Sequence, residues 1–194
     1  MASVANAEHY SNFTDVKPDS WYYEDVDNAV RLGIINGKSE TTFAPNDNLT
    51  YAEAIKLASC MYQLYKDGSV YLVSQGNPWY QTYVDYCIDN GIIDKYYDYD
   101  EKATRSGYAV IFANALPDEA LAKINSVADG SIPDVPETRA YAPEVYKLYR
   151  AGIIQGSDAE HNFKPLDNIK RSEVAAILSR MMDKTKRVRF SMGA

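Results

Sequence analysis

The sequence has few of the residues from which many catalytic and metal sites are built. It contains two histidines, His9 and His161, and two cysteines, Cys60 and Cys87, among 194 residues. Histidine triads, multi-histidine metal sites and most general-base schemes that use histidine are therefore hard to assemble. The cysteines are too few and too scattered for a disulfide framework or a cysteine-rich zinc site. We expect both to be small core residues, and the sequence leaves their redox state open.

Long apolar runs and an excess of positive charge are also missing. No stretch approaches the roughly 20 apolar residues that a membrane-spanning helix requires, so we expect no membrane span. The net charge of −7 argues against nucleic acid as the main partner, because phosphate binding needs a dominant basic face. The 46% hydrophobic and 24% charged residues are typical of a folded protein. The unusual feature is the 17 tyrosines.

The sequence repeats itself three times. The first copy contains Phe13-Thr14-Asp15-Val16, Trp21-Tyr22-Tyr23, Gly33-Ile34-Ile35-Asn36-Gly37, Phe43, Pro45 and Leu49-Thr50-Tyr51-Ala52-Glu53. The second copy repeats this order with Trp79, Gly91-Ile92-Ile93 and Ala103-Thr104-Arg105-Ser106-Gly107. The third copy repeats it with Ile132-Pro133-Asp134-Val135, Gly152-Ile153-Ile154-Gln155-Gly156, Phe163, Pro165 and Ile169-Lys170-Arg171-Ser172-Glu173. Position 21 corresponds to positions 79 and 140, which are offsets of 58 and 61 residues. A spacing this regular indicates a repeat architecture.

Each copy has the pattern of a helix, a loop and a second helix. The first helices are expected to begin near Ser20 and near Asn77-Pro78, where Asn can cap a helix and Pro suits its first turn. These helices end at glycines, which are Gly33, Gly91 and Gly152. The isoleucine pair after each glycine is expected to fold back as a buried plug. Thr50 and Glu53 form a capping box. One copy buries too little apolar surface to be stable, so the three should share a core.

These motifs together resemble the S-layer homology domain family. The resemblance rests on Phe-x-Asp-Val, Trp, Gly-Ile-x-x-Gly, Phe-x-Pro and the Thr-Arg-Ala-Glu type of helix start, and it covers about residues 13–184. It implies an all-α fold in which three helix-loop-helix repeats form a pseudo-threefold trefoil with a central three-helix bundle. The implied repeats are 13–65, 73–117 and 132–184, with an N-terminal tail at 1–12 and the start of a C-terminal linker at 185–194.

The resemblance also implies a function, which is non-catalytic anchoring at the bacterial cell surface. Members of this family bind secondary cell wall polymer or another peptidoglycan-linked glycan, often pyruvylated, in grooves between repeats. We therefore expect no enzymatic activity, no cofactor and no metal. We expect an extracellular location in the cell wall or S-layer, and a larger surface protein continuing C-terminal to this chain. Ala5-Asn6-Ala7 has the form that ends many signal peptides, so a signal peptide removed before about Glu8 is expected.

Arg105 and Arg171 match the family arginine that pairs with the ketal carboxylate. Each lies at the mouth of a predicted helix, where a guanidinium can hold a carboxylate bidentately and free backbone amides favour an anion. The alternative for both is a solvated helix end. The other glycan-binding candidates are Lys170, Tyr51, Trp21, Trp79, Gly37 and Gly156, and the structural-motif candidates are Asp15, Asp134, Glu53 and Glu173. The two tryptophans could offer flat faces to a sugar ring or pack in the core.

No copy has the complete family pattern. Copy 1 has Tyr51 where the arginine is expected, and copy 3 has Lys170 where the threonine is expected. Copy 2 has Gly107 in place of the glutamate and lacks both Phe-x-Asp-Val and Phe-x-Pro. Copies 2 and 3 therefore retain a cation for glycan binding, while the groove that would use Tyr51 is expected to be altered or idle.

Three further features have simpler interpretations. The carboxylates Asp94, Asp98, Asp100 and Glu101 fail the EF-hand spacing and are expected to form a solvated acidic loop. The basic residues Lys184, Lys186, Arg187 and Arg189 are expected to be the solvated start of a linker. The tyrosines Tyr96, Tyr97 and Tyr99 suit either a sugar platform or a cover for apolar core.

Two other functions remain as alternatives. One is a protein-protein assembly or docking module in which the glycan grooves are vestigial. The other is an enzyme that acts on glycans, which we disfavour because glycosidases need two carboxylates at a set separation and no pair here is marked by spacing or environment.

Overall fold

The computed structural model describes residues 12–193, and almost all of its regular structure is helical. The helices are α1 (Tyr23–Arg31), α2 (Tyr51–Asp67), α3 (Gln81–Asp89), α4 (Arg105–Asn114), α5 (Ala142–Arg150) and α6 (Arg171–Met182), followed by a 3-10 helix (Lys184–Lys186). Two short strands, β1 (Ser126–Val127) and β2 (Ser191–Met192), complete the described elements. The all-α prediction is confirmed. His9 and the expected signal-peptide site lie outside the described residues, as does all of the predicted tail except Asn12.

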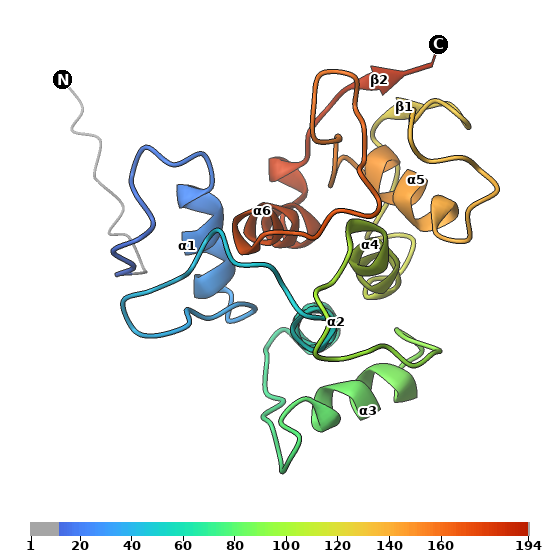
Figure 1. The fold of residues 1–194 in the computed structure, drawn as a ribbon. Helices are drawn as coiled ribbons and strands as arrows, with labels where there is room; N and C mark the ends of the chain where they lie inside the picture. The colour runs from blue at the N-terminus through green and yellow to red at the C-terminus, as the bar shows by residue number, and fades with distance from the viewer. Residues whose placement is uncertain (1–11, 194) are drawn as a thin grey trace.

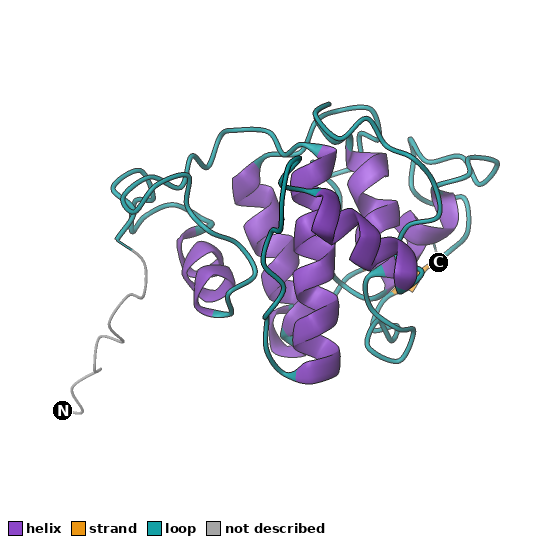
Figure 2. Cartoon of the chain, turned by 90° about the horizontal axis from the view of Figure 1, so that it is seen from below, coloured by secondary structure: helices purple, strands orange, loops and turns teal. Residues whose placement is uncertain are grey.

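The longer helix of each copy lies in the centre of the molecule and the shorter helix lies outside it (Figures 1 and 2). Each short helix packs against the central helix of another copy: α1 against α6, α3 against α2, and α5 against α4. Among the described elements, no such contact joins the two helices of one copy. The repeats are therefore interlocked, and none of them forms a closed unit alone. The complete pseudo-threefold trefoil stays a prediction.

A ring of backbone hydrogen bonds connects the three copies just before the central helices. Leu49 donates to Ile169 over 3.1 Å, Ile169 donates to Ala103 over 3.3 Å, and Ala103 donates back to Leu49 over 2.8 Å. Each of these residues is fully buried. Because buried amide and carbonyl groups need partners, the ring fixes the starts of α2, α4 and α6 relative to one another.

Several local predictions are confirmed. The Thr50 side chain accepts from the Glu53 amide while the Glu53 carboxylate accepts from the Thr50 amide, which is the expected capping box at the start of α2. The three glycines after the short helices have φ between 69° and 73°, the left-handed conformation that ends a helix: Gly33, Gly91 and Gly152. The isoleucine pairs that follow are buried, as the plug prediction requires: Ile34, Ile35, Ile92, Ile93, Ile153 and Ile154.

The predicted starts of two short helices are wrong by three or four residues. Helix α1 begins at Tyr23 because the chain before it forms turns, in which Ser20 donates to the Lys17 carbonyl over 2.9 Å. Helix α3 begins at Gln81, so Asn77 does not cap it and Pro78 is not in its first turn. The segment before α3 is held instead by side-chain bonds, including one from the Ser74 hydroxyl to the Trp79 carbonyl.

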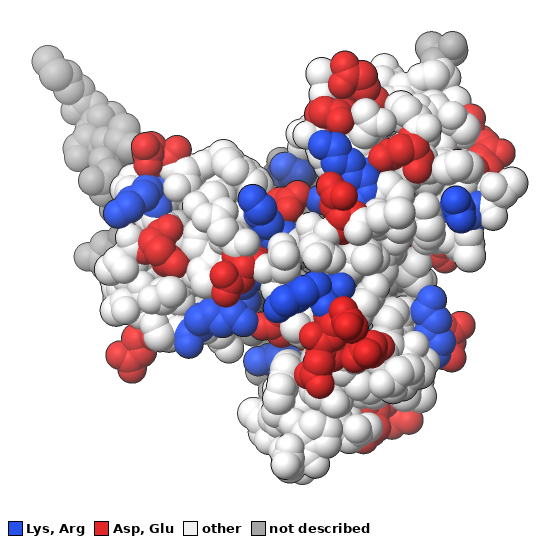
Figure 3. Space-filling view, viewed as in Figure 1, with Lys and Arg blue, Asp and Glu red and all other residues white. Residues whose placement is uncertain are grey.

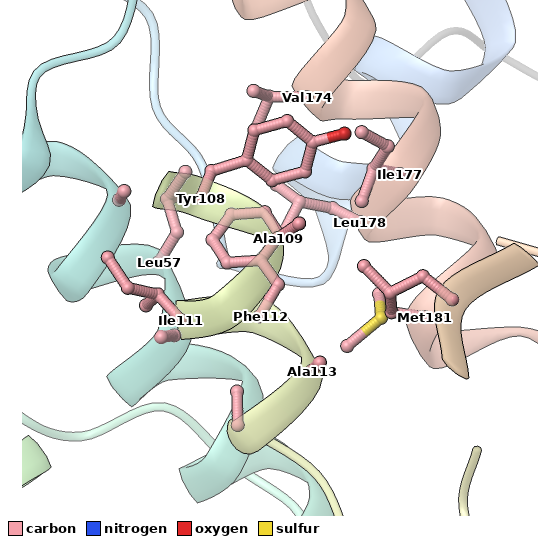
Figure 4. Packing of buried hydrophobic residues seen from close by; sticks show 14 of the residues in the cluster. Leu57, Tyr108, Ala109, Ile111, Phe112, Ala113, Val174, Ile177, Leu178 and Met181 are labelled. Atoms are coloured by element: carbon pink, nitrogen blue, oxygen red, sulfur yellow. The ribbon is translucent and has the colours of Figure 1, made fainter. Parts of the chain in front are cut away.

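Two rings of α4 fill the space between the central helices (Figure 4). Tyr108 and Phe112 are fully buried, with ring centroids 5.5 Å apart. They lie among side chains from the other two central helices: Leu57 of α2 and Val174, Ile177, Leu178 and Met181 of α6. The backbones of α4 and α6 therefore each contact α2 but not one another. Cys60 and Cys87 lie in the same core, as predicted, and both are free thiols. Burial raises the pKa of both, that of Cys87 to about 12.

The end of the chain packs onto the third copy instead of forming a solvated linker start. Strand β2 pairs in parallel with β1. Arg187 is 8% exposed and donates to the carbonyls of Ala120 and Arg180. Asn125 accepts from the Phe190 amide over 3.0 Å and donates to the Val188 carbonyl over 2.9 Å. The expectation for the basic run is wrong at Arg187, because its guanidinium satisfies buried carbonyls, whereas Lys184 and Arg189 are exposed.

We expect Tyr108→Phe to raise the free energy of unfolding by about 1 kcal/mol, because a buried hydroxyl without a partner carries a desolvation cost. The Tyr108 hydroxyl has no hydrogen-bond partner among the described residues, and burial raises its pKa to about 12. Urea denaturation followed by circular dichroism measures the change. Tyr149→Phe is the matched control and should destabilise, because the Tyr149 hydroxyl donates to the His161 carbonyl over 3.0 Å. A loss of stability in Tyr108→Phe would contradict this account.

Candidate functional site

Two grooves contain the predicted arginines, and each draws residues from all three copies. The Arg171 groove has a volume of about 140 Å³ and is lined by Ile34, Ile35, Asn36, Gly37, Lys38, Leu49, Glu53, Lys56 and Leu57 of copy 1, Trp79 of copy 2 and Arg171 of copy 3. The Arg105 groove has a volume of about 130 Å³ and is lined by Ile154, Gln155, Gly156, Glu173, Ala176, Ile177 and Arg180 of copy 3, Trp21 of copy 1 and Arg105 of copy 2. The interlocked repeats thus bring together a cation, a tryptophan and a glycine that lie far apart in the sequence.

Arg171 is the first residue of α6 and is only 4% exposed. Its Nε donates to the Phe43 carbonyl over 2.9 Å and its Nη2 donates to the Asn36 carbonyl over 2.7 Å. The guanidinium carbon lies 4.6 Å from the centre of the Phe43 ring. Burial lowers the pKa of Arg171, while the charges of Glu53 and two aspartates act against this effect. An arginine stays charged at neutral pH under such conditions, so this is a fixed cation.

Arg105 occupies the equivalent place at the first residue of α4 and is 6% exposed. Its Nε donates to the Phe163 carbonyl over 2.6 Å, and its Nη1 forms an ion pair with Glu173 over 2.6 Å. Burial alone would lower the pKa of Arg105, but Tyr108 and Glu173 outweigh it and the pKa is raised. For Arg105 and Arg171 alike, the alternative of a solvated helix end is wrong.

Glu53 and Glu173, the third residues of α2 and α6, each lie in a groove with an arginine of another copy. Glu173 pairs with Arg105 over 2.6 Å, whereas Glu53 pairs with Lys38 over 2.5 Å. Each glutamate also accepts from a backbone amide at the start of its own helix. The structural role predicted for Glu173 therefore extends to pairing with Arg105, and that of Glu53 extends to pairing with Lys38.

The third groove differs at every position that defines the other two. We call it the Tyr51 groove; its volume is about 670 Å³ and it is lined by Tyr51, Asp94, Lys95, Tyr96, Tyr97, Asp98, Thr104, Ser106, Gly107, Val110, Asn114, Ala140, Tyr141 and Glu144. Tyr51 stands where the arginine would be and Gly107 where the glutamate would be. Ala140 stands where the tryptophan would be, and Lys95 where Gly37 and Gly156 lie in the other copies.

Tyr51 and Gly107 are fitted to one another. A Cβ added to Gly107 would overlap the Tyr51 ring and hydroxyl. The ring also lies 5.0 Å from that of Tyr97, and the Tyr51 hydroxyl is 3.2 Å from the Thr104 hydroxyl. The tyrosine therefore occupies space that a glutamate at position 107 would need.

The remaining predicted residues have distinct positions. Trp21 is 64% exposed and Trp79 is 43% exposed, so the core-packing alternative is wrong for both. Gly37 and Gly156 line their grooves, and a side chain at either position would overlap neighbouring backbone. Lys170 is exposed and lines none of these three grooves.

The aspartates of Phe-x-Asp-Val hold the Phe-x-Pro loops. Asp15 accepts from the amides of Phe43 and Ala44 over 2.9 and 2.7 Å. Asp134 accepts from the amides of Phe163 and Lys164 over 2.7 and 2.6 Å. Through the carbonyls of Phe43 and Phe163, these loops in turn receive the groove arginines. The two motifs therefore work together, and copy 2 lacks both.

Sequence reasoning missed five polar residues of the two arginine grooves. Asn36, Lys38 and Lys56 line the Arg171 groove, and Gln155 and Arg180 line the Arg105 groove. Asn36, Lys38 and Gln155 had a signal, since they adjoin the motif glycines; Lys56 and Arg180 lie within helices, where exposed cations are ordinary. Figure 3 shows acidic and basic side chains interspersed on one face of the molecule.

Within residues 12–193 no group of His, Cys, Asp and Glu could hold a metal, and no described helix is long and apolar enough to cross a membrane.

Comparison with known proteins supports the family resemblance. Residues 12–55 and 131–175 match the S-layer homology domain. The chain is also 32% identical over 133 residues to the Surface-layer 125 kDa protein of Lysinibacillus sphaericus; the alignment covers 62% of this chain and 11% of that protein. Two segments of the chain therefore match the S-layer homology domain, which confirms the resemblance seen in the sequence. The matched segments lie in the first and third copies, which have the motifs that copy 2 lacks.

We expect Glu53→Gln to lower the free energy of unfolding near neutral pH by about 0.5 to 1 kcal/mol, the range of a partly exposed ion pair. Burial would raise the pKa of Glu53, but Lys38, the Thr50 amide and Arg171 lower it below its ordinary value of 4.5. The ionised carboxylate therefore stabilises the fold above that value, and this contribution is lost as the pH falls through the lowered pKa. Urea denaturation at several pH values should show the difference between the two proteins shrinking below about pH 4. Glu40→Gln, at an exposed position, is the control; a difference that is independent of pH would contradict this account.

The fit between Tyr51 and Gly107 predicts opposite effects of one substitution in two backgrounds. Gly107→Ala should destabilise the natural protein by about 1 to 3 kcal/mol, because the added methyl group overlaps the Tyr51 ring. In a Tyr51→Ala background the same change should stabilise by up to about 1 kcal/mol, because alanine is the better helix former. Thermal unfolding of the four proteins measures the coupling. Equal effects in both backgrounds would show that the two residues are independent.

Proposed function

We propose that this chain is a non-catalytic anchoring module that binds an anionic secondary cell wall polymer in the Arg171 and Arg105 grooves. The observation that carries the proposal is that each groove places a buried, fixed arginine beside an exposed tryptophan. An acidic protein can bind an acidic glycan in this way, because the cations are concentrated where the ligand lies. The S-layer homology domains and the surface-layer relative support anchoring at the cell surface in general.

The ligand chemistry follows from what the arginines have left to donate. In each guanidinium, Nε and one Nη group donate hydrogen bonds within the described residues, while an arginine has five N–H donors. The other N–H groups are available to a carboxylate, which an arginine can hold bidentately. A pyruvate ketal would supply such a carboxylate on a sugar ring, and the tryptophan would cover an apolar face of the ring.

The charges of the two grooves favour an anion. The Arg171 groove is lined by three cations, Lys38, Lys56 and Arg171, and by one carboxylate, Glu53. The Arg105 groove is lined by two cations, Arg105 and Arg180, and by one carboxylate, Glu173. The glycines beside them have no room for a side chain, so backbone itself forms that part of each groove wall. On this proposal the protein acts outside the cell, in the wall or S-layer, and the polymer is either secondary cell wall polymer or another peptidoglycan-linked glycan.

The chain spans about 11% of its surface-layer relative. We propose that it likewise serves as the anchor of a larger surface protein that continues C-terminal to it. The packed segment around β2 then provides a firm connection, because a pulling force would act on Arg187 and on the β1 and β2 pairing before it reached the core.

A wall-sedimentation assay with Trp21→Ala and Trp79→Ala tests the proposal. The tryptophans are better targets than the arginines, because each arginine also satisfies carbonyls of another copy and its removal would leave buried groups unpaired. We expect the double variant to bind purified walls at least about tenfold more weakly, a loss of roughly 1.4 kcal/mol. The natural chain should not sediment with walls from which the polymer has been chemically removed.

The control is Tyr65→Ala, which removes an aromatic side chain that is 45% exposed and lines none of the three grooves. It should bind walls as the natural chain does. Binding to stripped walls, or equal binding by the tryptophan variant, would overturn the proposal. Concentration-dependent oligomers without any wall binding would instead favour the assembly or docking alternative.

A further inference from the structure

We propose that the Tyr51 groove binds a sugar unit that carries a free amino group, so that one domain recognises two kinds of sugar of opposite charge. This inference extends the proposed function, since the ligand is again a glycan of the wall. It rests on the residues of this groove, which differ from those of the two arginine grooves in charge, aromatic content and size.

The first argument is charge. Asp94, Asp98 and Glu144 line the Tyr51 groove against one cation, Lys95, whereas cations are in excess in both arginine grooves. None of these three carboxylates forms an ion pair with another described residue. The groove would therefore repel an anionic sugar at the distances over which charges act in a cleft. A ligand that carries an ammonium group would compensate this charge.

The second argument is the state of Glu144. Its Oε2 is shielded from solvent and has no hydrogen-bond partner within residues 12–193. A shielded carboxylate oxygen is costly unless a donor or a cation compensates it. Glu144 belongs to α5 of copy 3, while the loop opposite it belongs to copy 2, so the carboxylate lies at the junction between copies. An ammonium group bound in the groove would supply the missing positive charge.

The third argument is the aromatic wall. The Tyr51, Tyr96, Tyr97 and Tyr141 side chains line the groove. The Lys95 ammonium already lies 5.3 Å from the centre of the Tyr97 ring, which shows that a cation can sit on an aromatic face here. Tyrosine rings can also cover the apolar face of a sugar, and the hydroxyls of Thr104 and Ser106 offer polar partners for its hydroxyl groups.

The groove also has room for such a ligand. Its volume of about 670 Å³ exceeds those of the arginine grooves, about 140 and 130 Å³, because Ala140 replaces a tryptophan. Ligand pockets are commonly about 300 to 1,000 Å³. Tyr51 and Gly107 both line this wide groove and pack closely against one another.

The test is a calorimetric titration of the chain with a trimer of β-1,4-linked glucosamine and with the N-acetylated trimer of the same length. We expect saturable binding of the amino trimer, weakened at least about tenfold when its amines are acetylated, since a charge-assisted contact is lost. Binding should weaken with added salt. Amide chemical shifts should change around residues 94–98 and 107 and not around the arginines.

Glu144→Gln and Asp94→Asn should each weaken binding of the amino trimer by about threefold to tenfold, because each removes one unpaired carboxylate from the groove. Glu119→Gln makes the same change of charge at an exposed position outside this groove and should leave the affinity unchanged. Both groove variants keep the shape of the side chain, and circular dichroism verifies that they are folded.

The proposal is overturned by equal affinity for the two trimers, by no saturable binding, by shifts centred on the arginine grooves, or by unchanged affinity in both groove variants. The result is independent of the wall-binding test. A chain that binds the amino trimer but not walls would refute only the anchoring proposal, whereas one that binds walls but not the trimer would refute only this inference.

Discussion

The structure depends on the way each repeat is completed by its neighbours. The residues before the three central helices form a closed ring of backbone hydrogen bonds, in which Leu49, Ala103 and Ile169 each donate to one copy and accept from another. The outer helices follow the same rule, since each packs on the central helix of a different copy. A small repeat cannot bury enough apolar surface alone, and interlocking provides a shared core without enlarging any one copy.

The same interlocking builds the grooves, so the residues proposed to bind the glycan also hold the copies together. Arg105 and Arg171 begin helices of copies 2 and 3, yet their guanidinium groups satisfy carbonyls in loops of copies 3 and 1. Burying a charge is costly unless it is paired and hydrogen-bonded, and these loops meet that requirement before any ligand binds. The cation is thus fixed in advance, which lowers the ordering cost of binding an anion. This arrangement also explains why Arg105 and Arg171 are only 6% and 4% exposed.

The sequence allowed the helices, the repeat spacing, the capping box of Thr50 and Glu53 and the buried isoleucine pairs to be predicted, because each of these depends on local pattern. Which copy packs on which could not be predicted, since the same apolar stripe would fit any central helix. The burial of Arg171 was missed for the same reason: its partners Phe43 and Asn36 lie more than a hundred residues away in the chain. For Trp21 the sequence left exposure and core packing as alternatives; the side chain is exposed, and α1 begins at Tyr23, two residues after the tryptophan, and not near Ser20.

The third groove shows how a repeat can diverge within a fixed fold. In the Arg105 groove the arginine and the glutamate that pair with one another come from different copies, so losing Glu173 would leave the buried Arg105 without its ion-pair partner. In the third groove both positions have changed, to Tyr51 and Gly107, and the tyrosine ring lies where a side chain at position 107 would be. Ala140 and Lys95 also stand where the other grooves have a tryptophan and a glycine, so all four differences lie on the surface of one groove. A groove that had merely decayed would have no reason to retain a packed aromatic wall beside an uncompensated carboxylate. The fitted pair is better explained as an adaptation that preserves the junction between copies while changing the charge that the groove presents.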